Sequence, residues 1–595
     1  MVSIKKKEIK KKVSKKLGAF IREDVKTEDL KNLERLIFLI VLLALALTFL
    51  QLNRAQSYRK YDRIRFTSAG ATLYANLYTP TKTLSFQEKR PLLIFCHGIG
   101  SKRDFDLRIP IEFTKRGFYV AALDYQGHGE SGGNINNIDP HLDPIGSAGP
   151  ALAQDCTKLL EKLKTMAFYS NVNSSQIGLI GHSLGGLVVL MNQALNPEFK
   201  YTVAWAPLVN FIPPQFGLEW QDYEDFIPVN LLNSNNTDNL LIIMHTQDEV
   251  LDFKANALKA KELTNCTVIN ITKPLLGGGH QLFSNEVLAQ SIRWFEEKFF
   301  NSSVKNGPIN ISFIWNYILI ILNLVLLVFI ISLLISQSSK YFHLKPEIID
   351  KGEKKKKRIV VELKKISKVA LILIYSSLFI INWQFFTTYF GVIGIFYASL
   401  LFSSAFLLVK GIKYFWRFKK EKVESMRKAF ITLMKEEVNK SVLAYTLICA
   451  VYFIIVYLLF SFYYPFAFMW PSNIMNIFLS FFFFPVYFSI EILFRKLIYP
   501  NLSFLKSEKS KARITTITAV IIYVNLMLLA RSYSYLPSVL FTFIVLLIVT
   551  IFNTIIYEHT GQFSAVLISS FCIVSLFFSA VISNVVGVGA VSLLF

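Results

Sequence analysis

Long apolar runs divide the chain into regions with different hydrophobic patterns. Residues 36–52 are almost wholly apolar and form a run just long enough to cross about 30 Å of hydrocarbon. Residues 57–310 contain no comparable run, and their short apolar stretches alternate with turn residues, as in a folded, water-exposed domain. Apolar runs return in 311–595. They predict eight further spans at 311–335, 369–388, 390–409, 442–462, 474–494, 514–530, 536–556 and 564–585.

The central region begins with a predicted hairpin, "RIRFTSAGATLYANLYTP", and continues as short apolar strands separated by helical stretches. The predicted strands are "PLLIFC", "FYVAALD", "QIGLIG", "YTVAWAP", "LLIIMH" and "TVINIT". Such near-continuous apolar runs predict a mostly parallel sheet with helices on both faces. In sheets of this kind the functional groups lie on the loops that follow the carboxyl ends of the strands.

The positions of the basic residues indicate how the predicted spans are oriented in a membrane. The chain has 595 residues, 53% of them hydrophobic, and a formal net charge of +23. Its Lys and Arg residues cluster in "KKKEIKKKVSKK", "KGEKKKKRIVVELKKISK" and "KYFWRFKKEK", each beside an apolar run. Basic blocks in these places favour positive-inside determinants and contacts with anionic lipid, rather than nucleic-acid binding.

Threading the spans alternately through a membrane from a cytoplasmic start places every basic loop inside. The resulting prediction is a basic cytoplasmic N-terminus (1–35), a signal anchor (36–52), an extracytoplasmic domain (57–310) and a polytopic helical membrane domain (311–595). A cleaved signal peptide is disfavoured because the basic leader is long and no small-x-small cleavage site follows the apolar run. We expect a multi-pass protein of the cell membrane.

Candidate chemistry begins with "QIGLIGHSLGGLVVLMNQAL", in which a predicted strand leads through Gly-His-Ser-Leu-Gly into a predicted helix. A G-x-S-x-G between strand and helix is typical of a nucleophile elbow, because its glycines permit a tight turn that exposes the serine hydroxyl. This context favours Ser183 as a nucleophile over an ordinary serine in a glycine-rich turn. The backbone N–H of Leu184, near the helix start, is then expected to bind a developing oxyanion.

A second oxyanion donor is expected after "PLLIFC", where the chain reads His-Gly-Ile-Gly. The backbone N–H of Ile99 is the candidate. His128, in "YQGHGESGG", lies upstream of Ser183. The chain order serine, acid, histidine therefore excludes it as the base, and we expect it to stabilise its own loop.

Two histidines of the exposed domain follow Ser183, namely His245 and His280. His280 lies in "KPLLGGGHQLF", a loop after the last predicted strand, and is the stronger candidate for the general base. Asp248 comes first after the preceding strand in "HTQDEVLD" and is expected to orient the imidazole. Glu249 and Asp252 are expected to be surface charges.

Taken in order, "FCHGIG", "LDYQGHGESGG", "GHSLGG", "HTQDEV" and "GGGHQLF" resemble the α/β-hydrolase fold, in its monoacylglycerol-lipase and serine-aminopeptidase (S33) branch. The resemblance covers about residues 64–300. It implies a triad of Ser183, Asp248 and His280, with the oxyanion hole at Ile99 and Leu184. A short lid is expected between residues 211 and 238.

The membrane half is faintly similar to the CPBP (CAAX-processing) intramembrane protease family, through "SIEILFRKLIYPNL", "AVIIYVNLML" and "IIYEHTGQFSAVLISSFCIV". Ile490 stands where that family has its first glutamate, and Asn525 and Ser570 stand where it has histidines. A degenerate fold without proteolytic activity is therefore implied. Glu491 and Arg495, one turn apart, are expected to pair. Asn382, Gln384, Asn476 and Asn553 are expected to hydrogen-bond between helices.

We therefore expect a membrane-anchored serine hydrolase that cleaves ester bonds, with a lipid or acyl ester favoured as substrate because the site is tethered at a bilayer. A peptidase related to the serine aminopeptidases, a non-catalytic binding or sensory module, and a transporter are the alternatives. No metal or organic cofactor is expected. The five cysteines include no C-x-x-C pair, and the partners expected are the bilayer and a small substrate rather than nucleic acid.

Overall fold

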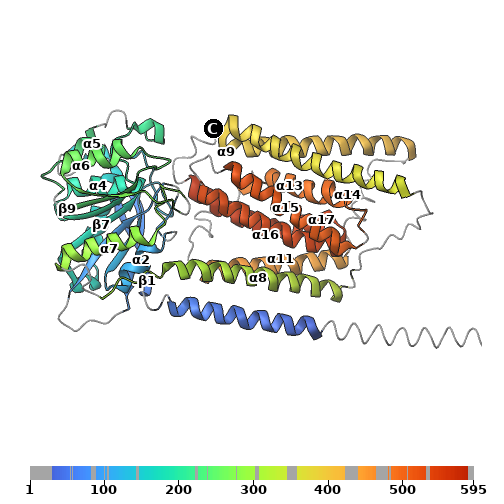
Figure 1. Cartoon of the computed structure of the whole chain (residues 1–595), viewed down its shortest axis with the longest axis horizontal. Helices are drawn as coiled ribbons and strands as arrows, with labels where there is room; N and C mark the ends of the chain where they lie inside the picture. Colours follow the sequence, from blue (N-terminus) through green and yellow to red (C-terminus); the bar gives the residue numbers. More distant parts are fainter. Residues whose placement is uncertain are drawn as a thin grey trace, which may run out of the picture.

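The structure is a computed structural model in which a sheet domain lies at one end and a bundle of long helices at the other (Figure 1). It describes residues 30–586 apart from short gaps. The gaps are 54, 56–57, 82–88, 100, 104–105, 143–145, 221–224, 238, 276–277, 302–306, 343, 345–357, 422–439, 464–479, 482–483, 506 and 531–535.

The sheet has eight strands in the order β1-β2-β4-β3-β7-β8-β9-β10. Strands β3, β4 and β7 to β10 pair in parallel, β2 is antiparallel to β4, and β1 is antiparallel to β2. The strands are β1 (Tyr58–Ser68), β2 (Ala71–Pro80), β3 (Arg90–Cys96), β4 (Tyr119–Asp124), β7 (Val172–His182), β8 (Tyr201–Trp205), β9 (Asn239–His245) and β10 (Thr267–Ile271). The predicted mostly parallel sheet is confirmed.

Helices cover both faces of this sheet, as the continuous apolar strands require. Helices α4 (Leu184–Leu195) and α6 (Lys259–Thr264) lie over one face, and α2 (Arg108–Lys115) and α7 (Asn285–Phe300) over the other (Figure 1). Helix α3 (Asp155–Lys164) packs against α4. A small hairpin of β5 (Ile138–Leu142) and β6 (Ser147–Pro150) was not predicted, because its strands are short and largely polar or small.

The helical half contains helices of membrane-spanning length. Six helices in the described part of the chain are long and apolar enough to cross a membrane. They are Leu30–Asn53, Phe313–Tyr341, Lys365–Tyr389, Gly394–Ile412, Lys440–Leu458 and Phe543–Thr560. The first corresponds to the predicted anchor, and the others match five of the eight predicted spans.

The other three predicted spans do not correspond to any of these six helices. Helices α15 (Glu508–Ala530) and α17 (Phe563–Val586) occupy two of them but are not among the six, and the region predicted at 474–494 is described mainly as α13 (Phe484–Glu491) and the π-helical η8 (Ile492–Ile498). Within α9 (Arg358–Glu421) the two spans fold back on each other, since Phe379 packs edge-on against Phe402 with ring centroids 5.2 Å apart.

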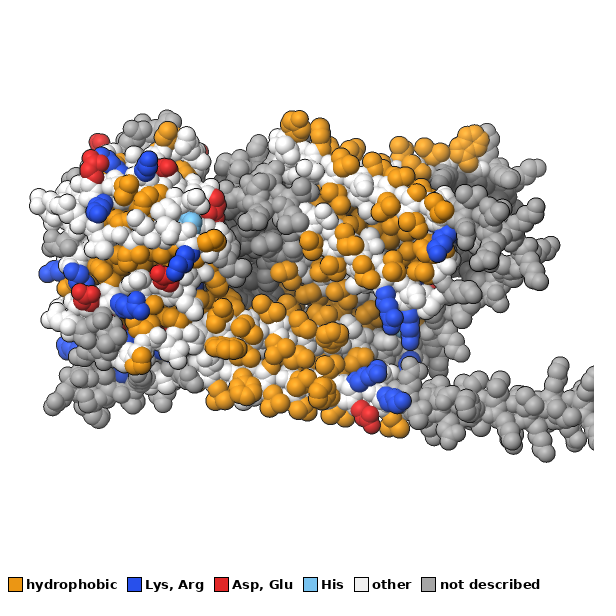
Figure 2. Space-filling model, in the orientation of Figure 1, with side chains coloured by type: hydrophobic (Ala, Val, Ile, Leu, Met, Phe, Trp, Pro, Cys, Tyr) orange, Lys and Arg blue, Asp and Glu red, His pale blue; other side chains and the backbone are white. Residues whose placement is uncertain are grey.

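Hydrophobic side chains predominate on the coloured part of the helical half's surface, whereas the sheet domain shows hydrophobic, polar and charged side chains together (Figure 2). Many of these apolar residues are more than half exposed, among them Phe38, Phe329, Leu373, Ile381 and Leu408. An apolar surface on this scale has no stabilising contact with water, so it fits burial in lipid.

Polar contacts hold the bundle together. Glu491 and Arg495 form the predicted ion pair, with Nε and Oε2 3.2 Å apart and both side chains buried. The Asn553 amide, on α16 (Leu536–Thr560), donates to Glu491 Oε1 at 2.8 Å and to Ser570 Oγ at 3.2 Å, and Asn382 donates to the Ala398 carbonyl. Such bonds join neighbouring helices where water is excluded.

The remaining residues that Sequence analysis named in this half form no such bond between helices among the described residues. Asn525 is exposed, and its amide donates to the carbonyl of Ile521 on its own helix. Gln384 is exposed, and Asn476 lies outside the described residues. Ile490 is buried.

Candidate active site

Ser183 occupies a tight turn between β7 and α4. Its φ is +54°, a left-handed conformation that is costly for a residue with a side chain, and its backbone N–H donates to the Trp205 carbonyl at 2.8 Å. A Cβ on Gly181 would meet the Gly185 carbonyl oxygen, and a Cβ on Gly185 would meet the Cys96 carbonyl oxygen, both far inside the 3.0 Å below which real Cβ contacts are essentially never seen. Glycine at both positions is therefore what lets the chain make this turn.

His280 lies directly against Ser183. Its Nε2 is 2.9 Å from Ser183 Oγ, and its Nδ1 is 2.9 Å from Asp248 Oδ2 and 3.0 Å from Asp248 Oδ1. The serine hydroxyl can donate to Nε2 while Nδ1–H donates to the carboxylate. Ser183 and His280 are only 4% and 5% exposed, so these contacts are shielded from water. The structure thus brings together the three side chains named from the sequence.

Two turns hold Asp248 and its neighbours. Asp248 Oδ1 accepts hydrogen bonds from the backbone N–H groups of Val250 and Leu251, each at 2.9 Å. Glu249 and Asp252 are exposed, as expected of surface charges, but each also binds backbone groups. Glu249 Oε2 accepts from the backbone N–H groups of Gly279 and His280, and Asp252 Oδ1 accepts from Ala255 N–H at a helix start. Short-range sequence reasoning did not foresee the Glu249 contact, because its partners lie some thirty positions away.

His182, the second residue of the G-x-S-x-G motif, supports the same loop. Its Nε2 donates to the His280 carbonyl at 2.8 Å. Burial, with a further contribution from the neighbouring His280, lowers the pKa of His182 to about 3, so its ring is neutral at physiological pH. The other candidate base, His245, faces away, with Nε2 3.1 Å from the Lys273 carbonyl and Nδ1 accepting from Gln247 N–H.

The predicted oxyanion donors flank Ser183. Leu184 begins α4, where backbone N–H groups lack intrahelical acceptors. On the other side, the loop after β3 passes close to the serine, since a Cβ on Gly98 would lie 3.5 Å from Ser183 Cβ and 2.9 Å from His182 Nδ1. Ile99 follows this glycine and is 37% exposed.

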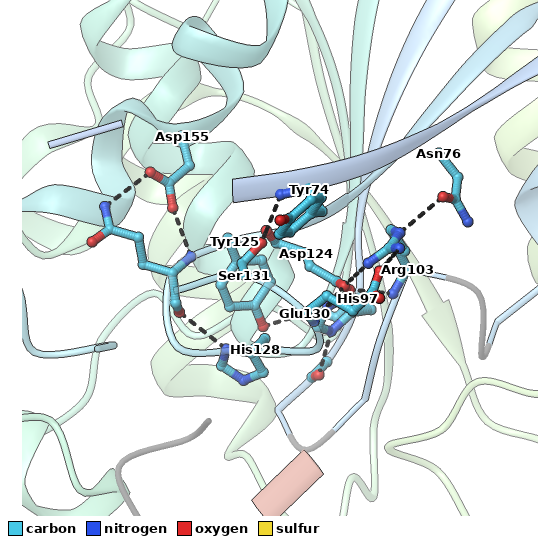
Figure 3. Close-up of polar contacts among 12 residues, drawn as sticks. Tyr74, Asn76, His97, Arg103, Asp124, Tyr125, His128, Glu130, Ser131 and Asp155 are labelled. Carbon is cyan, nitrogen blue, oxygen red and sulfur yellow. Dashed lines mark hydrogen bonds and ion pairs between the residues drawn. The ribbon is translucent and has the colours of Figure 1, made fainter. Parts of the chain in front are cut away.

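A buried polar network lies behind this loop (Figure 3). Arg103 pairs with Asp124 and with Glu130, and its Nε donates to Asn76 Oδ1 at 2.9 Å. His97 Nε2 is 3.3 Å from Asp124 Oδ1. Although burial opposes ionisation, the Arg103 guanidinium and His97 hold the pKa of Asp124 well below its usual range. His97, which directly precedes Gly98, is therefore held in place by its contact with Asp124.

His128 lies beside this network (Figure 3). Its Nδ1 is 3.2 Å from the Gln126 carbonyl of its own loop, and its ring packs against Tyr125 with centroids 4.4 Å apart. Burial lowers the pKa of His128 to about 3. Tyr125 in turn donates from its hydroxyl to the His97 carbonyl at 3.0 Å.

Metal ligands are not assembled in the residues that the structure describes, where no group of three His, Cys, Asp or Glu side chains could hold an ion. Cys96 and Cys156 are free and buried, with their sulfur atoms 3.5 Å apart.

The sheet order, the helices on both faces and the strained serine between β7 and α4 together define an α/β-hydrolase domain. Residues 87–273 match the family model described as "Serine aminopeptidase, S33".

Curated relatives match parts of the same chain. Platelet-activating factor acetylhydrolase of Cavia porcellus is 26% identical over 172 residues, which are 23% of this chain and 39% of the relative. An Escherichia coli protein described as "Uncharacterized 31.7 kDa protein in traX-finO intergenic region" is 32% identical over 120 residues, 20% of this chain and 37% of the relative. The chain therefore spans less than two fifths of either relative.

Solved structures resemble the chain more distantly. The acylaminoacyl peptidase of Pyrococcus horikoshii gives a TM-score of 0.32 at 15% identity, covering 43% of this chain and 44% of its own. Est1E of Butyrivibrio proteoclasticus, with ferulic acid bound, gives 0.31 at 19% identity, covering 40% of this chain and 98% of its own.

Proposed function

We propose that the protein is a membrane-anchored serine hydrolase that cleaves carboxylic esters, with acyl lipids as the favoured substrate class. The observation that carries the proposal is the pair of contacts at His280, to Ser183 Oγ on one ring nitrogen and to the Asp248 carboxylate on the other. A hydroxyl is a weak nucleophile unless a base takes its proton, and this arrangement provides one.

In the proposed reaction Ser183 Oγ attacks the ester carbonyl carbon while His280 Nε2 takes the hydroxyl proton. Asp248 keeps the imidazole in the competent tautomer and stabilises the imidazolium. The N–H groups of Leu184 and Ile99 bind the oxyanion of the tetrahedral intermediate. His280 then gives its proton to the leaving alcohol. Water, deprotonated by His280, attacks the acyl carbon, and the bond from that carbon to Ser183 Oγ breaks as His280 returns the proton to Oγ. The acyl group leaves as a carboxylic acid, which ionises in water.

An acyl lipid is favoured by the surroundings of the proposed site. Ile99 and Ile212 are 37% and 58% exposed, and they lie on the loops that follow β3 and β8, at the same edge of the sheet as Ser183. Between 211 and 238 the described residues of the proposed lid are a 3-10 helix (Pro213–Phe216), turns and the short α5 (Pro228–Leu231). Exposed aliphatic side chains on these loops suit contact with a hydrocarbon chain, and the apolar helices keep the domain near a bilayer.

We also propose that the hydrolase domain lies outside the cytoplasm. Lys and Arg side chains gather at the end of the helical half that is distant from the sheet domain (Figure 2). They open or close successive helices and include Lys31, Arg35, Lys340, Lys365, Lys368, Lys440, Lys509, Lys511 and Arg513. Under the positive-inside rule this end faces the cytoplasm and the hydrolase domain faces away from it.

The test is hydrolysis of p-nitrophenyl esters of increasing acyl length by the purified full chain in lipid nanodiscs, compared with Ser183→Ala. Turnover that rises with chain length and is lost in Ser183→Ala is expected. Cleavage of aminoacyl p-nitroanilides in preference to esters would instead support the peptidase alternative. A folded parent with no Ser183-dependent turnover of either substrate, and no reaction with a fluorophosphonate, would support the binding module.

A further inference from the structure

Helix α2 contacts both the loop that carries His280 and the first helix of the membrane half, α8 (Phe313–Tyr341). Figure 1 shows α2 beside the start of α8. Arg108 and Glu112 are one turn apart on this short helix. Arg108 contacts the His280 loop, and Glu112 contacts the start of α8. One element of 8 residues thus joins the proposed site to the bundle.

Arg108 is buried, with its donors directed at named partners. Its Nε and Nη2 bind both carboxylate oxygens of Asp106, at 2.6 to 3.0 Å. Its Nη1 donates to the carbonyls of Leu282, at 3.0 Å, and Gln281, at 3.4 Å. The Asp106 carboxylate therefore balances the guanidinium charge. Through its Nη1 hydrogen bonds, Arg108 holds the carbonyl groups of the two residues that follow His280.

The segment that Arg108 holds is strained. Leu282 has a φ of +46°, in the left-handed region that L-residues adopt at a cost. Its carbonyl accepts hydrogen bonds from both Arg108 and Ser284 N–H, and its side chain is fully buried. The Arg108 guanidinium also stacks over the rings of Trp205 and Phe283, 5.0 and 5.2 Å from their centroids. Arg108 therefore contacts residues on both sides of the Ser183–His280 pair.

Helix α8 is docked on the same elements. Glu112 Oε1 accepts hydrogen bonds from the backbone N–H groups of Ser312 and Phe313, at 2.8 and 2.6 Å, and so caps α8 from another domain. Phe283 packs edge-on against Phe313 and Tyr317, with centroids 5.3 and 5.7 Å away. The Tyr317 hydroxyl lies against the backbone N–H of Leu107, beside the Asp106–Arg108 pair. The aromatic contact is thus three residues from His280.

We propose that Arg108 is a positioning residue for His280, and that docking of α8 on α2 and Phe283 keeps it in place. The inference rests on the proposed function, in which His280 is the base for Ser183. A buried arginine with a carboxylate partner is weak evidence of stabilisation, since well-packed apolar residues often serve as well. Its directed contacts with a strained loop beside His280 argue instead for geometric control.

The experiment compares Arg108→Met with Arg116→Met. Arg116 directly follows the last residue of the same helix, also forms a buried bidentate pair, with Glu296, and donates to the Gly307 carbonyl in the segment leading to α8. It is a matched control for loss of a buried ion pair at the junction. The full chain in nanodiscs is assayed for the rate of fluorophosphonate labelling at Ser183, for kcat and KM on a soluble ester, and for thermal unfolding.

We expect Arg108→Met to lower the labelling rate and kcat by about 10²-fold, because a displacement of about 1 Å at a reacting group costs that much. KM should change by less than about threefold, since the proposal gives Arg108 a role in orienting His280 and none in holding the substrate. Arg108→Lys, which keeps the charge and one donor group, should recover part of the rate. Arg116→Met should stay within about threefold of the parent at a similar Tm.

Tyr317→Leu tests the membrane side of the proposal with a milder change. It removes the ring from Phe283 and the hydroxyl from Leu107, and we expect labelling to fall by about tenfold. Equal labelling rates in Arg108→Met and Arg116→Met would overturn the inference. The proposed function would still hold in that case, provided that the parent protein is labelled at Ser183. A folded parent that is not labelled at all would refute the proposed function and this inference with it.

Discussion

Replacing Asp248 with asparagine tests the proposed role of its carboxylate without changing its size. Asp248 Oδ1 accepts from two backbone N–H groups, those of Val250 and Leu251, and lies 3.0 Å from His280 Nδ1, whereas Oδ2 lies 2.9 Å from Nδ1. In Asp248→Asn the amide oxygen will take the Oδ1 place, because an NH2 there would face two donors. The NH2 group then points at Nδ1 and donates to it. This contact favours the His280 tautomer with its proton on Nε2, in which the ring cannot accept the Ser183 proton.

The magnitude follows from these contacts. If the amide of the Asp248→Asn side chain turns over, its oxygen can accept from His280 Nδ1–H, which restores the competent tautomer. The two backbone N–H groups then lose their acceptor, which costs about 1 to 2 kcal/mol each because they are partly exposed to water. Losing the charged partner of the imidazolium costs about 2 kcal/mol more. The sum of about 5 kcal/mol corresponds to a fall in kcat of roughly 10³- to 10⁴-fold.

The assay is turnover of a p-nitrophenyl ester by Asp248→Asn in nanodiscs, with Tm measured in parallel and Asp252→Asn as the control. Asp252 accepts a hydrogen bond from Ala255 N–H and is expected to leave kcat within about threefold of the parent. If folded Asp248→Asn retains more than about a tenth of the parental kcat, the assignment of Asp248 as the orienting acid is wrong.

Three further predictions follow from the same region. Gly185→Ala places a Cβ against the Cys96 and His97 carbonyls, and should lower the free energy of unfolding by roughly 1 to 3 kcal/mol and abolish labelling, whereas Gly411→Ala, with open space around it, should do neither. His182→Ala removes the donor to the His280 carbonyl and should lower kcat about fivefold to tenfold, whereas His182→Gln should be less affected. Equal kcat in the parent and both variants would show that this hydrogen bond does not position His280. Burial raises the pKa of Asp155 to about 6 from 3.8, so its contribution to stability is present below pH 4 and is lost as pH rises through 6, by about 3 kcal/mol. Asp155→Asn should therefore show a flatter Tm between pH 4 and 7 than the parent, and parallel curves would refute this.

Local patterns predicted the sheet domain well. Each strand named from an apolar run is present, because buried parallel strands need continuous apolar residues and show them plainly. The residues at Ser183 were also accessible, since a strained turn between strand and helix demands glycines at fixed spacing. Asp248 and His280 could be named because their positions after the last strands follow from chain order in this fold.

Contacts between distant segments were not accessible in the same way. Arg108 reads as one charge on a short amphipathic helix, and nothing local indicates that its guanidinium reaches the carbonyls after His280. Glu249 likewise binds backbone groups thirty positions on. In the helical half, helical spacing predicted the Glu491–Arg495 pair, and Asn553 was expected to bond between helices, as it does. Its partners, Glu491 and Ser570, could not be named in advance, because hydropathy does not reveal which positions of different helices meet.

The most direct test of the central claim is to locate a covalent adduct. The full chain in nanodiscs is treated with a fluorophosphonate, digested, and examined by mass spectrometry, beside His280→Ala and protein unfolded before treatment. We predict one phosphonyl group on the peptide containing Ser183, greatly reduced in His280→Ala and absent after unfolding. An adduct on a different residue, or a Ser183 that stays unmodified in the folded parent, would contradict the account.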